Sequence, residues 1–142
     1  MAGHAFRHLA PGAPAAAARL TAVREVSAVT AACLAVRREV FDEVGGFDEA
    51  LPITLNDVDF CLRVRAQGYA NLMAPHVRLV HHESASRGLD VAPDQSERLA
   101  HETAGFLSKW GAEALSDPFY SPHLTLARED GAPRDICVRR II

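Results

Sequence analysis

A nearly uncharged run over residues 25–36, EVSAVTAACLAV, does most to limit what this chain can fold into. Its small and β-branched residues predict a strand that is buried on both faces, as in a parallel or mixed sheet. The other strand-like pieces, residues 72–75 and 77–82, are short. These segments are too few for a complete doubly wound sheet, so we expect an α/β chain with a short sheet.

Glycines mark the ends of the helices that we expect between these strands. A short helix over residues 37–44 should stop at Gly45, because glycine adopts the left-handed conformation without a Cβ clash. A second helix should begin at Asn56, whose side chain can accept a free backbone N–H, and should close at Gly68. A longer helix is predicted over about residues 94–110, where apolar positions recur three and four apart.

Composition excludes several classes of function. The 142 residues carry 15 Lys and Arg against 18 Asp and Glu, and the resulting net charge of −3 does not suit a general nucleic-acid binder. No apolar run approaches the roughly 20 residues of a membrane span, and we expect no signal peptide. Three widely spaced cysteines without a C-x-x-C pair suit a reducing cytoplasm and provide neither a zinc knuckle nor a redox pair.

Two carboxylates, Asp57 and Asp59, stand at the start of the second predicted helix. Acids are common there because they cap the helix and complement its dipole. A carboxylate at such a junction can also face a cleft and accept a proton from a substrate hydroxyl. The pattern alone leaves both interpretations open.

Imidazole and guanidinium groups follow in the next predicted strand and loop. Neighbouring strand residues point to opposite faces, so at most one of His81 and His82 can face a given site, where its imidazole could bind a divalent cation. Arg87 precedes a glycine on the following loop, and an arginine in that position can bind phosphate oxygens, as can Arg63. Each of these residues can equally be an ordinary surface or core residue.

Taken in order, three segments resemble a known family. They are VTAACLAVRREVFDEVGGFD (residues 29–48), NDVDFCLRVRAQGY (residues 56–69) and APHVRLVHHESASRG (residues 74–88). The chain resembles the C-terminal, acceptor-side half of bacterial family 2 glycosyltransferases of the GT-A fold, in the rhamnosyltransferase-like group that builds surface polysaccharides. The resemblance implies a partial GT-A (Rossmann-like) fold with a short mixed sheet, flanking helices and a C-terminal helical extension. The implied divisions are a flexible N-terminal segment (1–24), the acceptor-side half (25–88) and a C-terminal helix with an irregular tail (89–142).

The resemblance implies that Asp57 is the catalytic base of an inverting transfer and deprotonates the acceptor hydroxyl. Many relatives have Glu where this chain has Asn56, a difference that removes a charge but leaves Asp57 in place. Asp57-Val58-Asp59 also spells the D-x-D of the family's nucleotide–metal signature. That signature ends an apolar strand, whereas here a proline-containing loop precedes it and a helix follows. We therefore favour the acceptor-side motif.

Further roles are implied at the other positions that match the family. The implied acceptor-binding residues are Gly46, Phe47, Asp48 and Asn56, and the implied phosphate-binding residues are Ser84 and Arg87. Asp59 and Arg63 are expected to hold their helix in place, and His81 is expected to ligate a divalent cation, Mn²⁺ or Mg²⁺. The implied partners are a nucleotide-diphosphate sugar donor and a glycan or lipid-linked acceptor. The expected location is the cytoplasm, either free or peripheral at the inner face of the membrane.

The chain departs from the family by lacking the N-terminal half, which carries the nucleotide pocket. We therefore expect a fragment, whose open sheet edge favours self-association or a partner that supplies the missing half. A non-catalytic remnant that binds a partner or a glycan is the main alternative. A small metal hydrolase using Asp57, Asp59, His81 and His82 would need three or more converging ligands, and the alternation of the two histidines counts against it.

Overall fold

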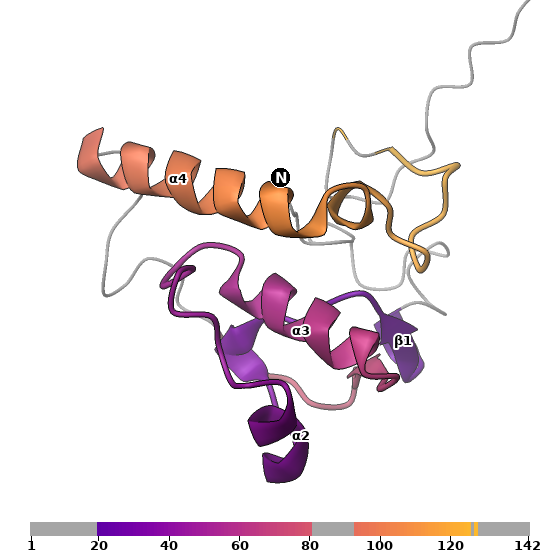
Figure 1. Cartoon of the computed structure of the whole chain (residues 1–142). Helices are drawn as coiled ribbons and strands as arrows, with labels where there is room; N and C mark the ends of the chain where they lie inside the picture. Colours follow the sequence, from indigo (N-terminus) through magenta and orange to yellow (C-terminus); the bar gives the residue numbers. More distant parts are fainter. Residues whose placement is uncertain (1–19, 81–92, 126, 128–142) are drawn as a thin grey trace, which may run out of the picture.

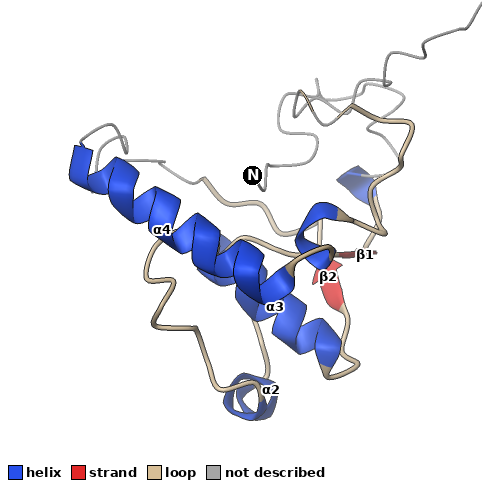
Figure 2. Ribbon diagram, turned by 45° about the horizontal axis from the view of Figure 1, so that its top comes forward, coloured by secondary structure: helices blue, strands red, loops and turns tan. Residues whose placement is uncertain are grey.

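A computed structural model describes residues 20–80, 93–125 and 127 of the chain. Its elements are β1 (Arg24–Val26), the 3₁₀ turn η1 (Ala31–Cys33), α2 (Arg38–Glu43), α3 (Asn56–Ala66), β2 (Asn71–Met73), α4 (Pro93–Trp110) and the 3₁₀ turn η2 (Glu113–Leu115) (Figure 1). α3 lies at the centre of this part of the chain, with α4 on one side and α2 on the other (Figure 1). The two strands lie together near α3 (Figure 2).

The sheet of the described residues consists of β1 and β2, paired antiparallel with Arg24 opposite Met73. An antiparallel pair therefore stands where the sequence predicts a short mixed sheet. The buried Asn71 fastens this pair to α3. Its side-chain amide donates to the carbonyl oxygens of Ser27 at 2.9 Å and Cys61 at 3.0 Å.

The strand predicted over residues 25–36 is wrong beyond Val26, because the following residues form the exposed turn η1 instead. The Thr30 hydroxyl accepts the Ala32 amide at 3.3 Å. The Asp57 carboxylate accepts the first amide of η1 at 3.1 Å. Side chains thus occupy amides that a strand would use in its ladder, a competition typical of Thr and Asp.

The turn after α2 follows the prediction, and glycine is needed there for two reasons. Gly45 and Gly46 have φ angles of 79° and 70°, in the left-handed region. A Cβ atom on Gly46 would also lie 3.1 Å from the Phe41 ring. The chain then turns back, so that the Phe47 ring packs 5.8 Å from Phe41 and 5.0 Å from Phe60, measured between centroids. This packing holds the loop after α2 against α3.

α3 begins at Asn56 as predicted, and the Asn56 side chain accepts a backbone amide as expected, but the preceding residue occupies the N-cap position. Leu55, at the N-cap, has a φ of 62° and makes no side-chain cap. Instead the Asn56 Oδ1 atom accepts the Asp57 amide at 2.7 Å, and the Asp57 Oδ1 atom accepts the Val58 amide at 2.8 Å. The helix closes as predicted before Gly68, whose φ is 85°. The first turn of α3 therefore caps itself.

α4 confirms the long helix expected near the C-terminal end. It spans Pro93–Trp110, and Gly111 follows with a φ of 50°. The helix buries Phe106 and also the carboxylate of Glu102. Among the helices of the described residues, none has the length and apolar character to cross a bilayer.

Two apolar clusters pack on α3. The α2-side cluster consists of Val40, Phe60, Cys61 and Val64, and the α4-side cluster consists of Leu51, Leu62 and Phe106. Burial of each large side chain contributes about 1.5–3 kcal/mol. α3 supplies residues to both clusters, so it is the element on which the rest of the fold is assembled.

Apolar side chains also remain exposed along β2 and the segment that follows it. This apolar strip consists of Leu72, Val77, Leu79 and Val80, each at least 55% exposed. The strand predicted over residues 77–82 is irregular at 77–80, and residues 81–82 lie outside the described part of the chain.

Candidate functional site

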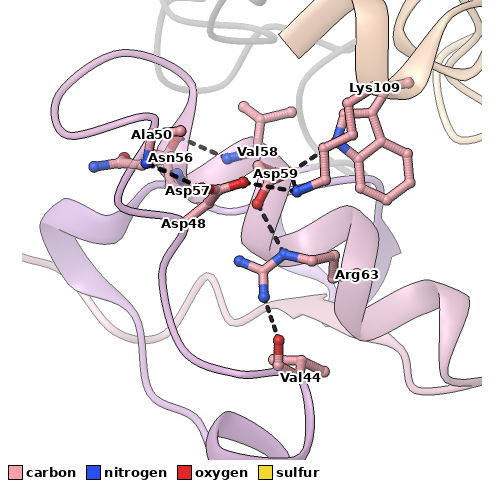
Figure 3. A network of polar contacts seen from close by, with 10 residues as sticks. Val44, Asp48, Ala50, Asn56, Asp57, Val58, Asp59, Arg63 and Lys109 are labelled. Atoms are coloured by element: carbon pink, nitrogen blue, oxygen red, sulfur yellow. Dashed lines mark hydrogen bonds and ion pairs between the residues drawn. The ribbon is translucent and has the colours of Figure 1, made fainter. Parts of the chain in front are cut away.

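The carboxylate of Asp59 is the centre of a polar network between α3 and α4 (Figure 3). Asp59 is completely buried. Its Oδ2 atom accepts the Arg63 Nε–H at 2.8 Å, and its Oδ1 atom accepts Trp110 Nε1–H and Lys109 Nζ–H, each at 2.8 Å. A buried carboxylate is tolerated because these donors replace the water that it lost. The network joins the two helices at a fixed point.

The two ionisable groups at the centre of this network remain charged. Burial raises the pKa of Asp59, but the hydrogen bonds from Lys109, Trp110 and Arg63 together outweigh it and bring the pKa below the ordinary value. Burial lowers the pKa of Lys109, and the hydrogen bonds to Asp48 and Asp59 outweigh that effect, so its pKa is raised. Both shifts favour the ion pair near neutral pH.

The loop after α2 is tied to the same network. The Lys109 ammonium reaches Asp48 Oδ2 at 2.8 Å, and Asp48 Oδ1 accepts the Ala50 amide at 3.0 Å. The hydrogen bond from Lys109 holds the pKa of Asp48 below its ordinary value. The Arg63 guanidinium donates to the Val44 carbonyl at the start of the loop. Residues 44–50 are thereby held at both ends by side chains of α3 and α4.

A hollow of about 370 Å³ opens beside this loop. We call it the loop hollow; its lining residues are Gly45, Phe47, Asp48, Glu49, Arg63 and Lys109. Two of the four predicted acceptor-binding residues, Phe47 and Asp48, therefore share one hollow. Gly46 is buried and does not line the hollow, and the Asn56 side-chain amide donates to the Pro52 carbonyl at 3.5 Å. The structure does not bring Asn56 to the hollow.

The predicted base, Asp57, is half-buried at the first turn of α3. Its Oδ1 atom accepts the Val58 amide at 2.8 Å, and its Oδ2 atom accepts the Ala31 amide at 3.1 Å. A carboxylate has about four acceptor positions, so two hydrogen bonds leave capacity for a hydroxyl proton. Asp57 and Asp59 thus differ sharply: Asp59 is enclosed by cationic and indole donors, whereas Asp57 is fixed by backbone amides and is partly accessible.

Sequence reasoning missed the residues of α4 that complete the network. Trp110 ends the long helix predicted from apolar spacing, which gives no sign of its hydrogen bond to Asp59, and no pattern in the sequence singles out Lys109. Glu102 was also missed, although it lies between Leu99 and Phe106 on the expected apolar face. It is 2% exposed, and its Oε2 atom accepts the Thr54 amide. The sequence offered one signal for Glu102: an acidic residue at a position where the helical spacing predicts an apolar one.

Several predicted site residues lie outside the described part of the chain. They are the metal ligand His81, its neighbour His82, and the phosphate-binding residues Ser84 and Arg87. Within the described ranges, no group of three or more His, Cys, Asp or Glu side chains could hold a metal ion. Asp59 is already engaged by Arg63, Trp110 and Lys109, so the described Asp57–Asp59 pair does not form a cation site.

Three of the known proteins that are similar to this chain show what it is related to. It is 45% identical over 113 residues to an uncharacterized protein, y4gI, of Sinorhizobium fredii, a match that covers 79% of this chain and 12% of that protein. It is 40% identical over 130 residues to the O-antigen biosynthesis protein RfbC of Myxococcus xanthus, covering 91% of this chain and 10% of that protein. It is 34% identical over 84 residues to an N-acetylglucosaminyl-diphospho-decaprenol L-rhamnosyltransferase of Mycobacterium tuberculosis, covering 59% of this chain and 26% of that protein.

The chain spans about a tenth to a quarter of the length of these relatives. No family model matches it, and no solved structure matches it. Over part of its length the chain is related to glycosyltransferases of polysaccharide biosynthesis. The resemblance inferred from the sequence is confirmed at this level.

Proposed function

We propose that this chain forms the acceptor side of an inverting glycosyltransferase that transfers a sugar from a nucleotide-diphosphate donor during surface polysaccharide synthesis. The observation that supports the proposal is the position of the Asp57 carboxylate at the start of a helix that is fixed in place. This carboxylate is partly accessible, while two residues further along α3 the buried Asp59 anchors the helix to α4. A base positioned by a rigid helix can meet a substrate hydroxyl with reproducible geometry.

In the proposed reaction Asp57 accepts the proton of an acceptor hydroxyl as the oxygen attacks the anomeric carbon of the donor. The nucleotide diphosphate leaves from the opposite side of that carbon, so the configuration inverts. The loop residues Gly46, Phe47 and Asp48, with Asn56 at the helix start, are proposed to bind the acceptor. Ser84 and Arg87 are proposed to bind the diphosphate. A divalent cation, with His81 as its expected ligand, would neutralise charge on the leaving group.

The acceptor is proposed to be a glycan or a lipid-linked sugar. The mycobacterial relative is named for a lipid-linked acceptor, N-acetylglucosaminyl-diphospho-decaprenol. A lipid-linked acceptor would place the reaction at the inner face of the membrane. The exposed apolar strip (Leu72, Val77, Leu79 and Val80) fits a further proposal, that a second copy or a donor-binding half packs against this part of the chain.

The direct test is sugar transfer by the purified chain, supplied with UDP-, dTDP- and GDP-sugars, Mn²⁺ and a lipid extract as acceptor. Asp57→Asn should lower the transfer rate by about 10²–10⁴-fold, the usual contribution of a general base. Asp42→Asn, which changes an exposed acid on α2, is the matched control. Equal rates in wild type and Asp57→Asn would contradict the assigned role.

The donor side is tested by calorimetry with UDP, dTDP and GDP, each with and without Mn²⁺. Binding that requires Mn²⁺ would mean that this chain itself carries a diphosphate site. If no nucleotide binds, the donor side must lie outside these 142 residues, and the transfer assay is repeated with the polypeptide segment that supplies it. Tight Mn²⁺ binding without nucleotide would instead favour a metal hydrolase.

A second candidate is a glycan-binding module without catalytic activity. Both oxygens of Asp57 accept backbone amides, so fixing η1 to α3 is a sufficient structural role for this residue. Saccharide binding together with transfer that is insensitive to Asp57→Asn would favour this candidate.

A further inference from the structure

We propose that the loop hollow binds a single neutral pyranose ring of the acceptor, with Phe47 as its stacking surface and the Asp48–Lys109 pair as its polar contact. The inference rests on the proposed function, because it names the substrate class for the same loop. It also adds Arg63 and Lys109, which the family resemblance does not place in acceptor binding. Lys109 brings the C-terminal end of α4 into the site (Figure 3).

Phe47 has the exposure and the support that a stacking surface needs. Its side chain is 41% exposed, although the residue lines the hollow. The ring packs against Phe60 in a tilted arrangement, 5.0 Å between centroids, and against Phe41 in an edge arrangement at 5.8 Å, so its position is fixed. An aromatic ring presents apolar area at little cost in conformational entropy, which suits the C–H face of a sugar.

The Asp48–Lys109 pair supplies both kinds of hydrogen-bonding group beside this ring. The Lys109 ammonium has three N–H donors, and the described residues use two of them, on Asp48 and Asp59. Asp48 accepts one hydrogen bond on each oxygen and retains further acceptor positions. The Lys109 side chain is 39% exposed and the Asp48 side chain is 30% exposed, so a ligand can reach both. Sugar hydroxyls donate and accept, and therefore match such a pair.

The charge and size of the hollow narrow the ligand class. The negative charges of Asp48 and Glu49 balance the positive charges of Arg63 and Lys109 on the lining. The buried Asp59 adds a further negative charge behind both cations. A uronic acid or a sugar phosphate would meet no excess of positive charge, so a neutral ring is favoured. A volume of about 370 Å³ lies at the small end of the usual range for ligand sites, roughly 300–1,000 Å³.

The test is an NMR titration of the isotope-labelled chain with methyl glycosides. Methyl α-L-rhamnopyranoside and methyl N-acetyl-β-D-glucosaminide are the neutral probes, and methyl β-D-glucuronide is the charged probe. We expect saturable amide shifts at residues 45–49 and at Lys109 with a neutral probe. The glucuronide should bind on the order of tenfold more weakly. The proposal is overturned if neither neutral probe gives saturable shifts there, or if the glucuronide binds equally well.

Two variants test the assigned contacts and keep Asp59, Lys109 and Trp110 in place. Phe47→Leu removes the aromatic face, and Asp48→Asn removes the carboxylate; each should weaken binding on the order of tenfold. Phe119→Leu and Asp42→Asn are the matched controls, because neither residue lines the hollow. Unchanged affinity in both test variants would overturn the proposal even if a saccharide binds.

The outcomes also separate this inference from the proposed function. Transfer that depends on Asp57 but is insensitive to Phe47→Leu and Asp48→Asn would retain the transferase and reject the loop hollow as its sugar site. Binding at the hollow with transfer that is insensitive to Asp57→Asn would retain the sugar site and reject the assigned base.

Discussion

α3 meets its neighbours in two different ways. Toward α2 it presents Phe60, Cys61 and Val64, which pack by shape in the α2-side cluster. Toward α4 it also presents the charged Asp59, which is held by hydrogen bonds from α4 and from its own Arg63. The apolar contacts are the larger source of stability, whereas the polar contacts fix one orientation of α4 on α3.

This difference bears on function because the loop hollow adjoins the polar side. Hydrophobic contact is non-directional, and small shifts within the α2-side cluster change its energy little. The distances around Asp59 and Lys109 tolerate less movement, since charge-assisted hydrogen bonds require short and well-aligned contacts. A sugar site built there inherits its geometry from the ion-pair network.

The largest expected effect on stability is on the apolar side. Phe60 is 1% exposed and packs against the rings of Phe41 and Phe47. Phe60→Ala should lower the free energy of unfolding by about 3–5 kcal/mol, because it leaves a cavity. Urea unfolding followed by circular dichroism measures the change. Val80→Ala, at a position that is 80% exposed, is the control and should stay within about 0.5 kcal/mol.

On the polar side the sharpest change is Asp59→Asn. It leaves the shape intact but removes the charge that pairs with Arg63 and Lys109, so a loss of about 3 kcal/mol is expected. The same unfolding measurement on Asp57→Asn should show a smaller loss, of about 1 kcal/mol, because the half-buried asparagine keeps one of the two oxygens that accept the Val58 and Ala31 amides. Comparable losses in the free energy of unfolding for Asp59→Asn and Asp57→Asn would contradict the distinction between a buried, anchoring Asp59 and an accessible Asp57.

Low pH should selectively weaken the polar contacts between α3 and α4. The pKa of Asp59 is lower in the folded protein than its ordinary value, so the unfolded chain binds its proton at a higher pH. The stability from this group is therefore complete above about pH 4 and is lost as the pH falls through the folded pKa. Asp48 acts in the same direction. Urea midpoints between pH 7 and pH 2 should fall more steeply for wild type than for Asp59→Asn, and parallel curves would contradict this.

The smallest expected effect is one of reactivity, without any change in stability. Cys61 is buried in the α2-side cluster, and burial raises the pKa of its thiol, whereas Cys33 is exposed. Cys33 should therefore react with iodoacetamide on the order of tenfold faster or more, as read by peptide mass spectrometry. In Phe60→Ala the rate at Cys61 should rise toward that of Cys33. An unchanged rate would mean that the apolar side closes around the cavity.

Local signals in the sequence predicted the helices, but they did not predict how the helices meet. Gly45 and Gly68 mark helix ends because the left-handed conformation is a property of the residue itself. The turn η1 could not be predicted in the same way, since its amides are captured by Thr30 and, from a distant helix, by Asp57. The resulting local structure overrides the strand propensity of its residues.

The same limit applied to the candidate site. The D-x-D pattern singled out two carboxylates, and only the packed structure separates the buried one from the accessible one. Lys109 reaches Asp48 across 61 positions in the sequence, and Trp110 reaches Asp59 across 51. A pairing at such a distance leaves no periodicity to detect in one sequence.

The contact between Asp59 and the C-terminal end of α4 also limits recombination between genes for related chains. A crossover between two relatives at any point between α3 and α4 would set an aspartate from one parent against a Lys–Trp pair from the other. A hybrid without the Lys–Trp pair would leave the buried aspartate without its donors. Such a hybrid would fail to fold, before any activity could be tested. α3, the loop hollow and the last turn of α4 should therefore be inherited together, although they extend over residues 45–110, nearly half of the 142-residue chain.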